Sequence, residues 1–218
     1  MLIKICGITS PEAARQCFEA GADMIGLVHY KPSPRHLEVS AVRKIIEAAE
    51  MFRKTGQKIV LVVSDPVPED FSQLLTLFSE PVCGKIDYIQ WHGSSRPPET
   101  QQSRLPPLIH VVRDRERAAQ WLRTAPQNLP AVAPDTLFLY EMSKGTLPGG
   151  NGNAWDWADA EPFCRRFPTM IAGGITPENA AEAVRKTRPF GIDVSSGVED
   201  APGIKNVTKI KRIIENIK

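Results

Sequence analysis

Short, continuous apolar runs recur along this chain, separated by longer amphipathic stretches. Eight runs are candidate strands: Leu2–Cys6, Met24–Tyr30, Ile59–Asp65, Tyr88–His92, Leu108–Val112, Leu137–Glu141, Thr169–Gly174 and Gly191–Gly197. Most of them are apolar throughout and do not alternate with polar residues, which is typical of strands covered on both faces in a parallel sheet. The pattern therefore predicts parallel strands linked by helices.

The stretches between these runs carry helix start and stop signals. Ser10 is a candidate N-cap, Pro11 a first helical residue and Gly21 a stop. Thr176 and Pro177 repeat this start ahead of a second helix. A further segment places four apolar residues on one helical face, namely Val42, Ile45, Ile46 and Ala49.

Eight strand–helix units in 218 residues predict a compact (β/α)8 TIM barrel. We expect it to form a single domain over residues 1–218, because no linker or low-complexity segment interrupts the series. A doubly wound open sheet is the alternative. It is disfavoured because no Gly-x-Gly-x-x-Gly turn follows the first run.

Composition excludes several classes of partner. The formal net charge of +2 gives no reason to expect nucleic acid or an acidic membrane surface. No stretch approaches the ~18 apolar residues of a membrane span, and the start of the chain does not read as a secretory signal. No two of the four cysteines, Cys6, Cys17, Cys83 and Cys164, have C-x-x-C spacing, so neither a zinc site nor a redox pair is expected. We expect a cytoplasmic protein with reduced thiols.

Reactive residue types accumulate where the apolar runs end. Cys6, Asp65, His92 and Glu141 each end a run, and Asp193 lies in the last one. The active site of a (β/α)8 barrel lies at the C-terminal ends of its strands, so we expect these residues to meet there. Ordinary exits to solvent would more often show Lys, Asn, Ser or Gly.

Two glycine-bearing segments follow the seventh and eighth runs. Barrels often bind phosphate at these two places, through backbone N–H groups that glycine allows to approach the anion closely. The bland alternative is that these glycines only make tight turns. The candidate phosphate-binding residues are Gly173, Gly174, Ser195, Ser196 and Gly197.

Six segments, read together, resemble the phosphoribosylanthranilate isomerase family of tryptophan biosynthesis. They are KICGIT (4–9), GADMIGLVHYKPSPRHL (21–37), QWHG (90–93), GGNGNAWDW (149–157), AGGITPENA (172–180) and GIDVSSGVE (191–199). They occur in the family's order over nearly the whole chain. The resemblance implies a cofactor-free (β/α)8 barrel that acts on a small phosphosugar as a monomer or a homodimer.

The resemblance also implies roles for single residues in an Amadori rearrangement. A general acid opens the furanose ring by protonating its oxygen, and a general base takes the proton from C2. Cys6 matches the general base. Glu141 occupies the position at the end of the sixth strand where the family has an aspartic acid as the general acid. Arg35 matches an arginine near the anthranilate carboxylate, and His92 and Asp193 match pocket residues.

This division of labour agrees with the chemistry of the two groups. A thiol has a reference pKa of about 8.5, which positive surroundings lower toward the range a base needs. A carboxylic acid needs a raised pKa to hold its proton at neutral pH. Two alternatives stay open: a paralogue that acts on a different aminated phosphosugar, and a non-catalytic phosphosugar-binding barrel in which the acid has drifted to Glu141.

Overall fold

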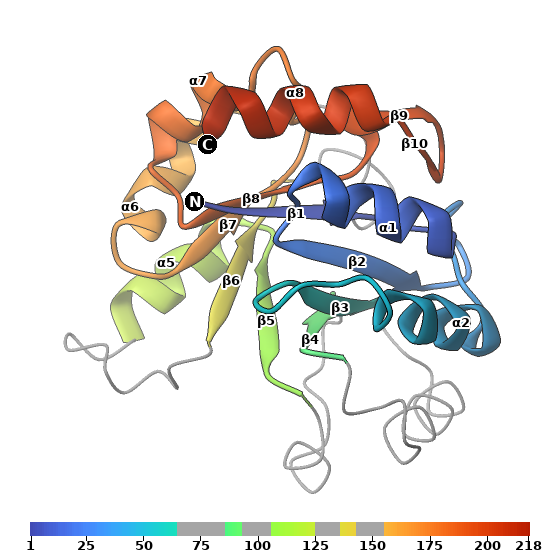
Figure 1. Ribbon diagram of the computed structural model, residues 1–218. Coiled ribbons are helices and arrows are strands. Elements are labelled where there is room, and N and C mark those ends of the chain that lie inside the picture. Colours follow the sequence, from blue (N-terminus) through green and yellow to red (C-terminus); the bar gives the residue numbers. More distant parts are fainter. Residues whose placement is uncertain (65–85, 93–105, 125–135, 143–154) are drawn as a thin grey trace, which may run out of the picture.

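Eight parallel strands form a closed barrel in chain order, with helices packed around it (Figure 1). The structure is a computed structural model, and it describes residues 1–64, 86–92, 106–124, 136–142 and 155–218. The strands are β1 (Leu2–Cys6), β2 (Met24–His29), β3 (Lys58–Val63), β4 (Tyr88–Trp91), β5 (Leu108–Val112), β6 (Leu137–Tyr140), β7 (Thr169–Ile171) and β8 (Gly191–Val194). The predicted (β/α)8 barrel is confirmed, and the open sheet is excluded because β1 pairs with β8.

Each predicted run overlaps one strand, but several strands end before the run does. β6 stops at Tyr140 and β7 at Ile171, so Glu141 and the glycines that follow β7 lie beyond the sheet. These residues leave the hydrogen-bonded ladder at the rim of the barrel. Asp65, which was expected to end the third strand, lies outside the described residues.

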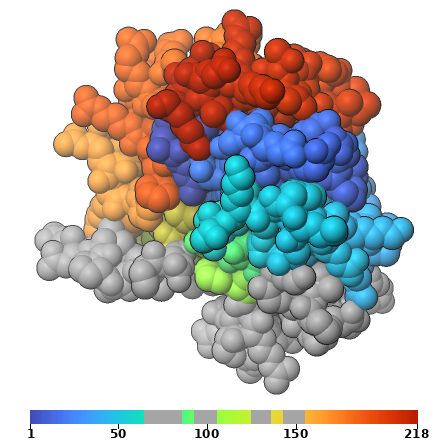
Figure 2. All heavy atoms as spheres, viewed as in Figure 1, coloured from blue at the N-terminus to red at the C-terminus, as the bar shows by residue number. Residues whose placement is uncertain are grey.

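Helices cover the barrel. They are α1 (Pro11–Ala20), α2 (Val39–Ala49), α5 (Arg115–Thr124), α6 (Glu161–Cys164), α7 (Ala180–Thr187) and α8 (Val207–Ile217), with 3-10 turns η3 (Trp157–Ala160) and η4 (Ser196–Val198). A hairpin of β9 (Glu199–Ala201) and β10 (Ile204–Lys205) precedes α8. In the space-filling view α8, α1 and α2 lie side by side over one side of the barrel (Figure 2).

The predicted caps of the first helix are confirmed. The Ser10 side chain accepts a hydrogen bond from the Ala13 N–H, and Gly21 ends α1 in the left-handed region at φ 105°. The four residues expected on one face of α2 are all buried.

The regular part of the seventh helix begins later than predicted, but Thr176 still caps the turn that leads into it, because its side chain accepts from the Glu178 N–H at 3.3 Å. The α7 helix begins at Ala180 with Asn179 in the N-cap position, not at Thr176 and Pro177. The Asn179 side chain folds back onto the preceding turn, where its Oδ1 accepts from the Thr176 N–H at 2.7 Å. The turn takes up the residues that were expected to form the first helical turn.

Two apolar layers hold the fold together. Successive strand residues point to opposite faces, so Ile3 and Ile5 of β1 pack outward against helix residues such as Phe18. The alternate positions fill the barrel interior, and they include Met24, Val60, Val62, Ile109, Val111, Leu137, Leu139 and Met170. Among the described helices, none is long and apolar enough to cross a membrane.

Candidate active site

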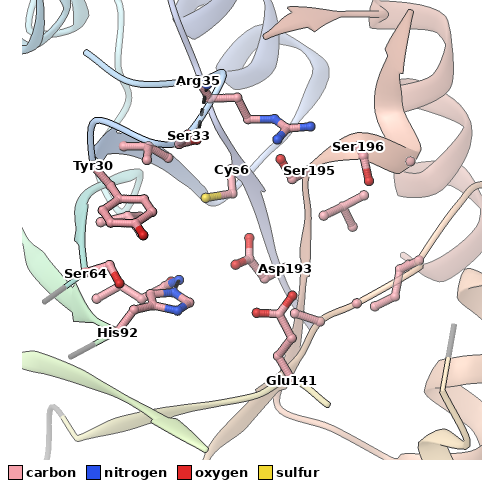
Figure 3. A pocket seen from close by; sticks show the side chains of 18 of the residues that line it. Cys6, Tyr30, Ser33, Arg35, Ser64, His92, Glu141, Asp193, Ser195 and Ser196 are labelled. Atoms are coloured by element: carbon pink, nitrogen blue, oxygen red, sulfur yellow. Dashed lines mark hydrogen bonds between the residues drawn. The ribbon is translucent and has the colours of Figure 1, made fainter. Parts of the chain in front are cut away.

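A cavity of about 730 Å³, including the part open to solvent, lies at the C-terminal ends of the strands. Ten residues predicted from the sequence line it, namely Cys6, Arg35, His92, Glu141, Gly173, Gly174, Asp193, Ser195, Ser196 and Gly197. Asp65, which was also expected there, lies outside the described residues. Figure 3 shows Cys6, Asp193 and Glu141 pointing into this space, with Asp193 between the other two. The barrel topology therefore brings together residues that are up to 191 positions apart.

Glu141 reaches the cavity because of its place on β6. Leu137 and Leu139 point into the barrel, and the two-residue period of a strand carries Glu141 to the same side. Its backbone N–H donates to the Val112 carbonyl at 2.9 Å, and the residue is buried. Gly173 has a φ of 91°, and a Cβ added there would lie 3.6 Å from the Glu141 Cγ. The loop after β7 therefore packs directly against the carboxylic side chain.

Cys6 shares the barrel interior with a buried ion pair. Lys4 and Asp193 are register partners on β1 and β8, and the Lys4 Nζ donates to the Asp193 Oδ2 at 2.8 Å. Burial raises the pKa of the Cys6 thiol, and the Lys4 ammonium opposes that rise. The positive surroundings expected from the chemistry are present, but the effect of burial on the pKa of the thiol is larger.

A glycine makes room for this arrangement. Gly26 on β2 is the register partner of Cys6, and a Cβ there would lie 2.7 Å from the Cys6 Sγ and 3.1 Å from the Lys4 Nζ. Glycine inside a strand often marks such a close approach. A glycine in the middle of an apolar run, here Gly26, could therefore have indicated the site, but we did not use it in the sequence analysis.

Arg35 lies in a buried ion pair at the edge of the cavity. Its Nε and Nη2 donate to the two carboxylate oxygens of Glu199 at 2.8 and 2.6 Å. Lys205 donates to the same carboxylate at 2.6 Å. Gly7 has a φ of 79°, and a Cβ there would lie 2.3 Å from the Arg35 Cδ, so the arginine passes directly over this glycine. Figure 3 shows Arg35 extending toward Ser195 and Ser196.

His92 is a neutral, hydrogen-bonded member of the cavity wall. Burial lowers the pKa of its imidazole well below the usual value, and the Arg113 guanidinium lowers it further. Because arginine only donates, the His92 Nδ1 accepts from Arg113 and Nε2 carries the proton. The Gln90 amide nitrogen lies 2.6 Å from the His92 Nε2. A 180° turn of the amide would place Oε1 there, as an acceptor for this N–H.

The two glycine-bearing loops touch each other. A Cβ added to Gly197 would lie 1.9 Å from the Ile175 carbonyl oxygen, so the turn after β8 packs on the loop after β7. Gly173 and Gly174 have φ values of 91° and 69°, which favour glycine. The first N–H groups of η4 have no acceptor within that short helix. The sequence therefore places backbone donors and glycines at one end of the cavity.

Several residues of the site were given no role in the sequence analysis. They are Lys4, Gln90 and Glu199, which lie in the family segments, and Arg113 and Lys205, which lie outside them. Counting by two from Cys6 and His92 would have placed Lys4 and Gln90 inside the barrel. Within the described ranges, no group of three His, Cys, Asp or Glu side chains is arranged to hold a metal ion.

Comparison with known proteins gives the family. A sequence model described as N-(5'-phosphoribosyl)anthranilate (PRA) isomerase matches residues 3–216. The chain belongs to the N-(5'-phosphoribosyl)anthranilate isomerase family. A relative of that name from Desulfatibacillum aliphaticivorans is 36% identical over 219 residues, which cover 98% of this chain and 91% of the relative.

Solved structures of the family share the fold. The phosphoribosylanthranilate isomerase of Thermotoga maritima aligns with a TM-score of 0.76 and 28% identity, over 99% of this chain and 98% of that one. Another structure of the isomerase, with a TM-score of 0.73 and 27% identity over 99% and 97% of the two chains, is described as a complex with reduced 1-(o-carboxyphenylamino)-1-deoxyribulose 5-phosphate. The family segment at 149–157 lies largely outside the described residues. Its last residues are described, and the indole N–H groups of Trp155 and Trp157 donate to the carbonyl oxygens of Ala172 and Gly173 in the loop after β7.

Proposed function

We propose that this protein is an N-(5'-phosphoribosyl)anthranilate isomerase of tryptophan biosynthesis, acting in the cytoplasm without a metal or cofactor. Membership of the family and the names of its relatives support this function. The observation that carries it is the pairing of a thiol and a carboxylic side chain, Cys6 and Glu141, across one cavity that ends in two glycine loops.

Glu141 is the general acid in this proposal. It protonates the furanose ring oxygen of the substrate, the bond from C1 to that oxygen breaks, and the nitrogen lone pair forms an iminium. Glu141 is buried at the end of β6, so its carboxyl group is held at the cavity and away from bulk solvent. Gly173 packs beside this side chain, where an added Cβ would lie at van der Waals distance, 3.6 Å, from the Glu141 Cγ.

Cys6 is the general base. As a thiolate it takes the proton from C2, the electrons of that C–H bond form the C1–C2 double bond, and the iminium becomes a neutral enolamine. The enolamine then tautomerises to the aminoketose. Lys4 is the charged group beside Cys6, and it favours the thiolate at the moment when the substrate carries the positive iminium.

The two anionic ends of the substrate have separate receptors. The phosphate is bound by the backbone N–H groups of the loops at Gly173–Gly174 and Ser196–Gly197. The anthranilate carboxylate is bound by Arg35, whose Nη1 remains directed away from the pair of hydrogen bonds to Glu199. The substrate then spans the cavity with C1 and C2 between Cys6 and Glu141.

Turnover by the purified protein tests this function. Phosphoribosylanthranilate is generated in situ, and its conversion is followed as the loss of anthranilate-type fluorescence. The proposal expects turnover with no added metal, and expects the gene to restore growth of a tryptophan auxotroph that lacks this step. Absence of both activities would contradict it and would favour a different aminated phosphosugar or a binding function.

A further inference from the structure

Lys205 is a buried cation beside the site that no motif singles out. It lies on β10, its side chain is 1% exposed, and it bonds Glu199 at 2.6 Å. It also donates to the Ser195 carbonyl oxygen at 3.3 Å. Burial lowers the pKa of the Lys205 ammonium, but the Glu199 carboxylate at 2.6 Å opposes that fall and favours the charged form.

Glu199 is the centre of a three-residue charge cluster, which we call the Arg35–Glu199–Lys205 triad. Burial alone would raise the pKa of the Glu199 carboxyl, but Arg35 and Lys205 hold it below its usual value. Two cations and one carboxylate leave the triad with a net charge of +1. Arg35 and Glu199 without Lys205 would form a neutral pair.

This difference matters because the triad is desolvated. Arg35 and Glu199 are 6% and 8% exposed, and charges in such surroundings interact more strongly than in water. A substrate anion that approaches Arg35 also meets the repulsive charge of Glu199 directly behind it. Lys205 balances that charge, so the attraction of Arg35 for an anion is preserved.

We propose that Lys205 is a positioning and specificity residue for the substrate carboxylate. It balances the charge of Glu199, so that Arg35 can bind the carboxylate. The inference rests on the proposed function and deepens it. Lys205 also ties the triad to the backbone of Ser195, the first residue of the turn assigned to the phosphate. One buried lysine thus links the receptors for the two anionic ends of the substrate.

Substitution of Lys205 by methionine tests the proposal, because methionine keeps an unbranched chain and removes the charge. Affinity for the reduced product analogue is measured by calorimetry, and KM and kcat by the fluorescence assay. We expect Lys205→Met to weaken affinity for the analogue and raise KM by at least tenfold, a larger change than the fall in kcat that follows from the lost positive charge near Cys6. Wild-type affinity and KM in Lys205→Met would overturn the proposal.

Lys209→Met is the matched control. Lys209 donates to the backbone carbonyl of the same Glu199 at 2.7 Å and pairs with Asp200, but it does not bond the Glu199 carboxylate. We expect its KM to stay within twofold of the wild type. An increase as large as that of Lys205→Met would overturn a specific role for Lys205.

The double variant Glu199→Gln/Lys205→Met separates charge balance from a structural role. It restores the net charge of +1, since Arg35 is then the remaining charge of the triad. We expect it to recover at least threefold of the affinity lost in Lys205→Met. A double variant that binds no better than Lys205→Met would overturn the proposal, because a lysine that only braces the loop cannot be replaced by removing its partner.

Two measures keep the result decisive. If Lys205→Met does not fold, Lys205→Gln carries the same test, since it lacks the charge but can still donate to Ser195. Calorimetry with the reduced product analogue does not require turnover. Absence of wild-type turnover would therefore contradict the proposed function, whereas the order of affinities among the variants decides the role of Lys205.

Discussion

The thiol of Cys6 shows how single residues set the chemistry of this cavity. Burial holds the thiol protonated, while Lys4 and Lys205 supply positive charge that favours the thiolate. Lys4 is itself fully buried and is stabilised by Asp193, so its charge stays beside the sulfur. The balance between burial and these cations decides how readily Cys6 can act as a base.

Removal of Lys4 should therefore make the Cys6 thiolate harder to form. In Lys4→Met we expect the pH at which iodoacetamide alkylates Cys6 to move upward, because a cation that lowers the pKa of the thiol is lost. The rate is measured by mass spectrometry of the Cys6 peptide between pH 7 and 10.

Two controls accompany the alkylation experiment. Lys58→Met removes a strand lysine that pairs with Asp87, and its profile should match the wild type. Cys17, whose pKa burial raises to about 12, should remain unmodified in the folded protein. An unchanged Cys6 profile in Lys4→Met would show that Lys4 does not act on the thiol.

Strands and their loops are the scale at which the sequence was most informative. The apolar runs predicted all eight strands, because parallel strands covered on both sides need continuous apolar sequence. The reactive residues at the run ends were predicted to share one site, and the structure places Cys6, His92, Glu141 and Asp193 around one cavity, whereas Asp65 lies outside the described residues. Periodicity and topology are enough to place Cys6, His92 and Glu141.

The features that we did not predict depend on contacts between residues far apart in the sequence or on side-chain geometry, which local sequence patterns do not contain. Lys205 meets Glu199 through a hairpin whose residues have no apolar periodicity. The Asn179 side chain accepts from the Thr176 N–H, so residues 176–179 form a hydrogen-bonded turn ahead of α7 that the helix signals alone did not predict. The pKa of Cys6 likewise depends on burial, which exists only in the folded barrel.

The contact between the two glycine loops belongs to this scale and can be tested. Gly197→Ala places a methyl group where the Ile175 carbonyl lies, at 1.9 Å, so the two loops must separate. We expect KM for phosphoribosylanthranilate to rise at least tenfold, because the backbone donors for the phosphate no longer converge. Steady-state kinetics provide the measurement.

Gly56→Ala is the control for a general effect on the fold. Apart from its chain neighbours, no described residue places an atom within 4 Å of a Cβ at Gly56, but its φ of 92° disfavours alanine. This variant should lose stability and keep its KM, because Gly56 does not line the cavity. A Gly197→Ala enzyme with wild-type KM would show that the phosphate does not depend on contact between the loops.

At the scale of the whole molecule, the two apolar layers have different tasks. The outer layer joins the helices to the barrel, and Phe138 is at its centre on the outward face of β6. The inner layer stops at the cavity, where polar residues replace apolar ones. The same strand thus contributes Phe138 to stability and Glu141 to the site.

Phe138→Ala should destabilise the protein without altering the site directly. The ring is fully buried, and its loss should lower the free energy of unfolding by about 3–5 kcal/mol, measured by urea denaturation. The aromatic rings that it contacts are His110, Trp121, Phe163 and Phe167. Phe190→Ala removes a ring that is 50% exposed and should cost less than about 1 kcal/mol. Equal losses in the two variants would contradict this assignment of the core.

The most direct test of the account is the kcat of Glu141→Gln with phosphoribosylanthranilate, measured against the wild type by loss of fluorescence. Glutamine keeps the size of the side chain but cannot donate a proton to the ring oxygen as a carboxylic acid does. The account predicts that the wild type turns over and that kcat falls on the order of 100-fold or more in the variant. A kcat within threefold of the wild type would contradict the assignment of Glu141 as the ring-opening acid.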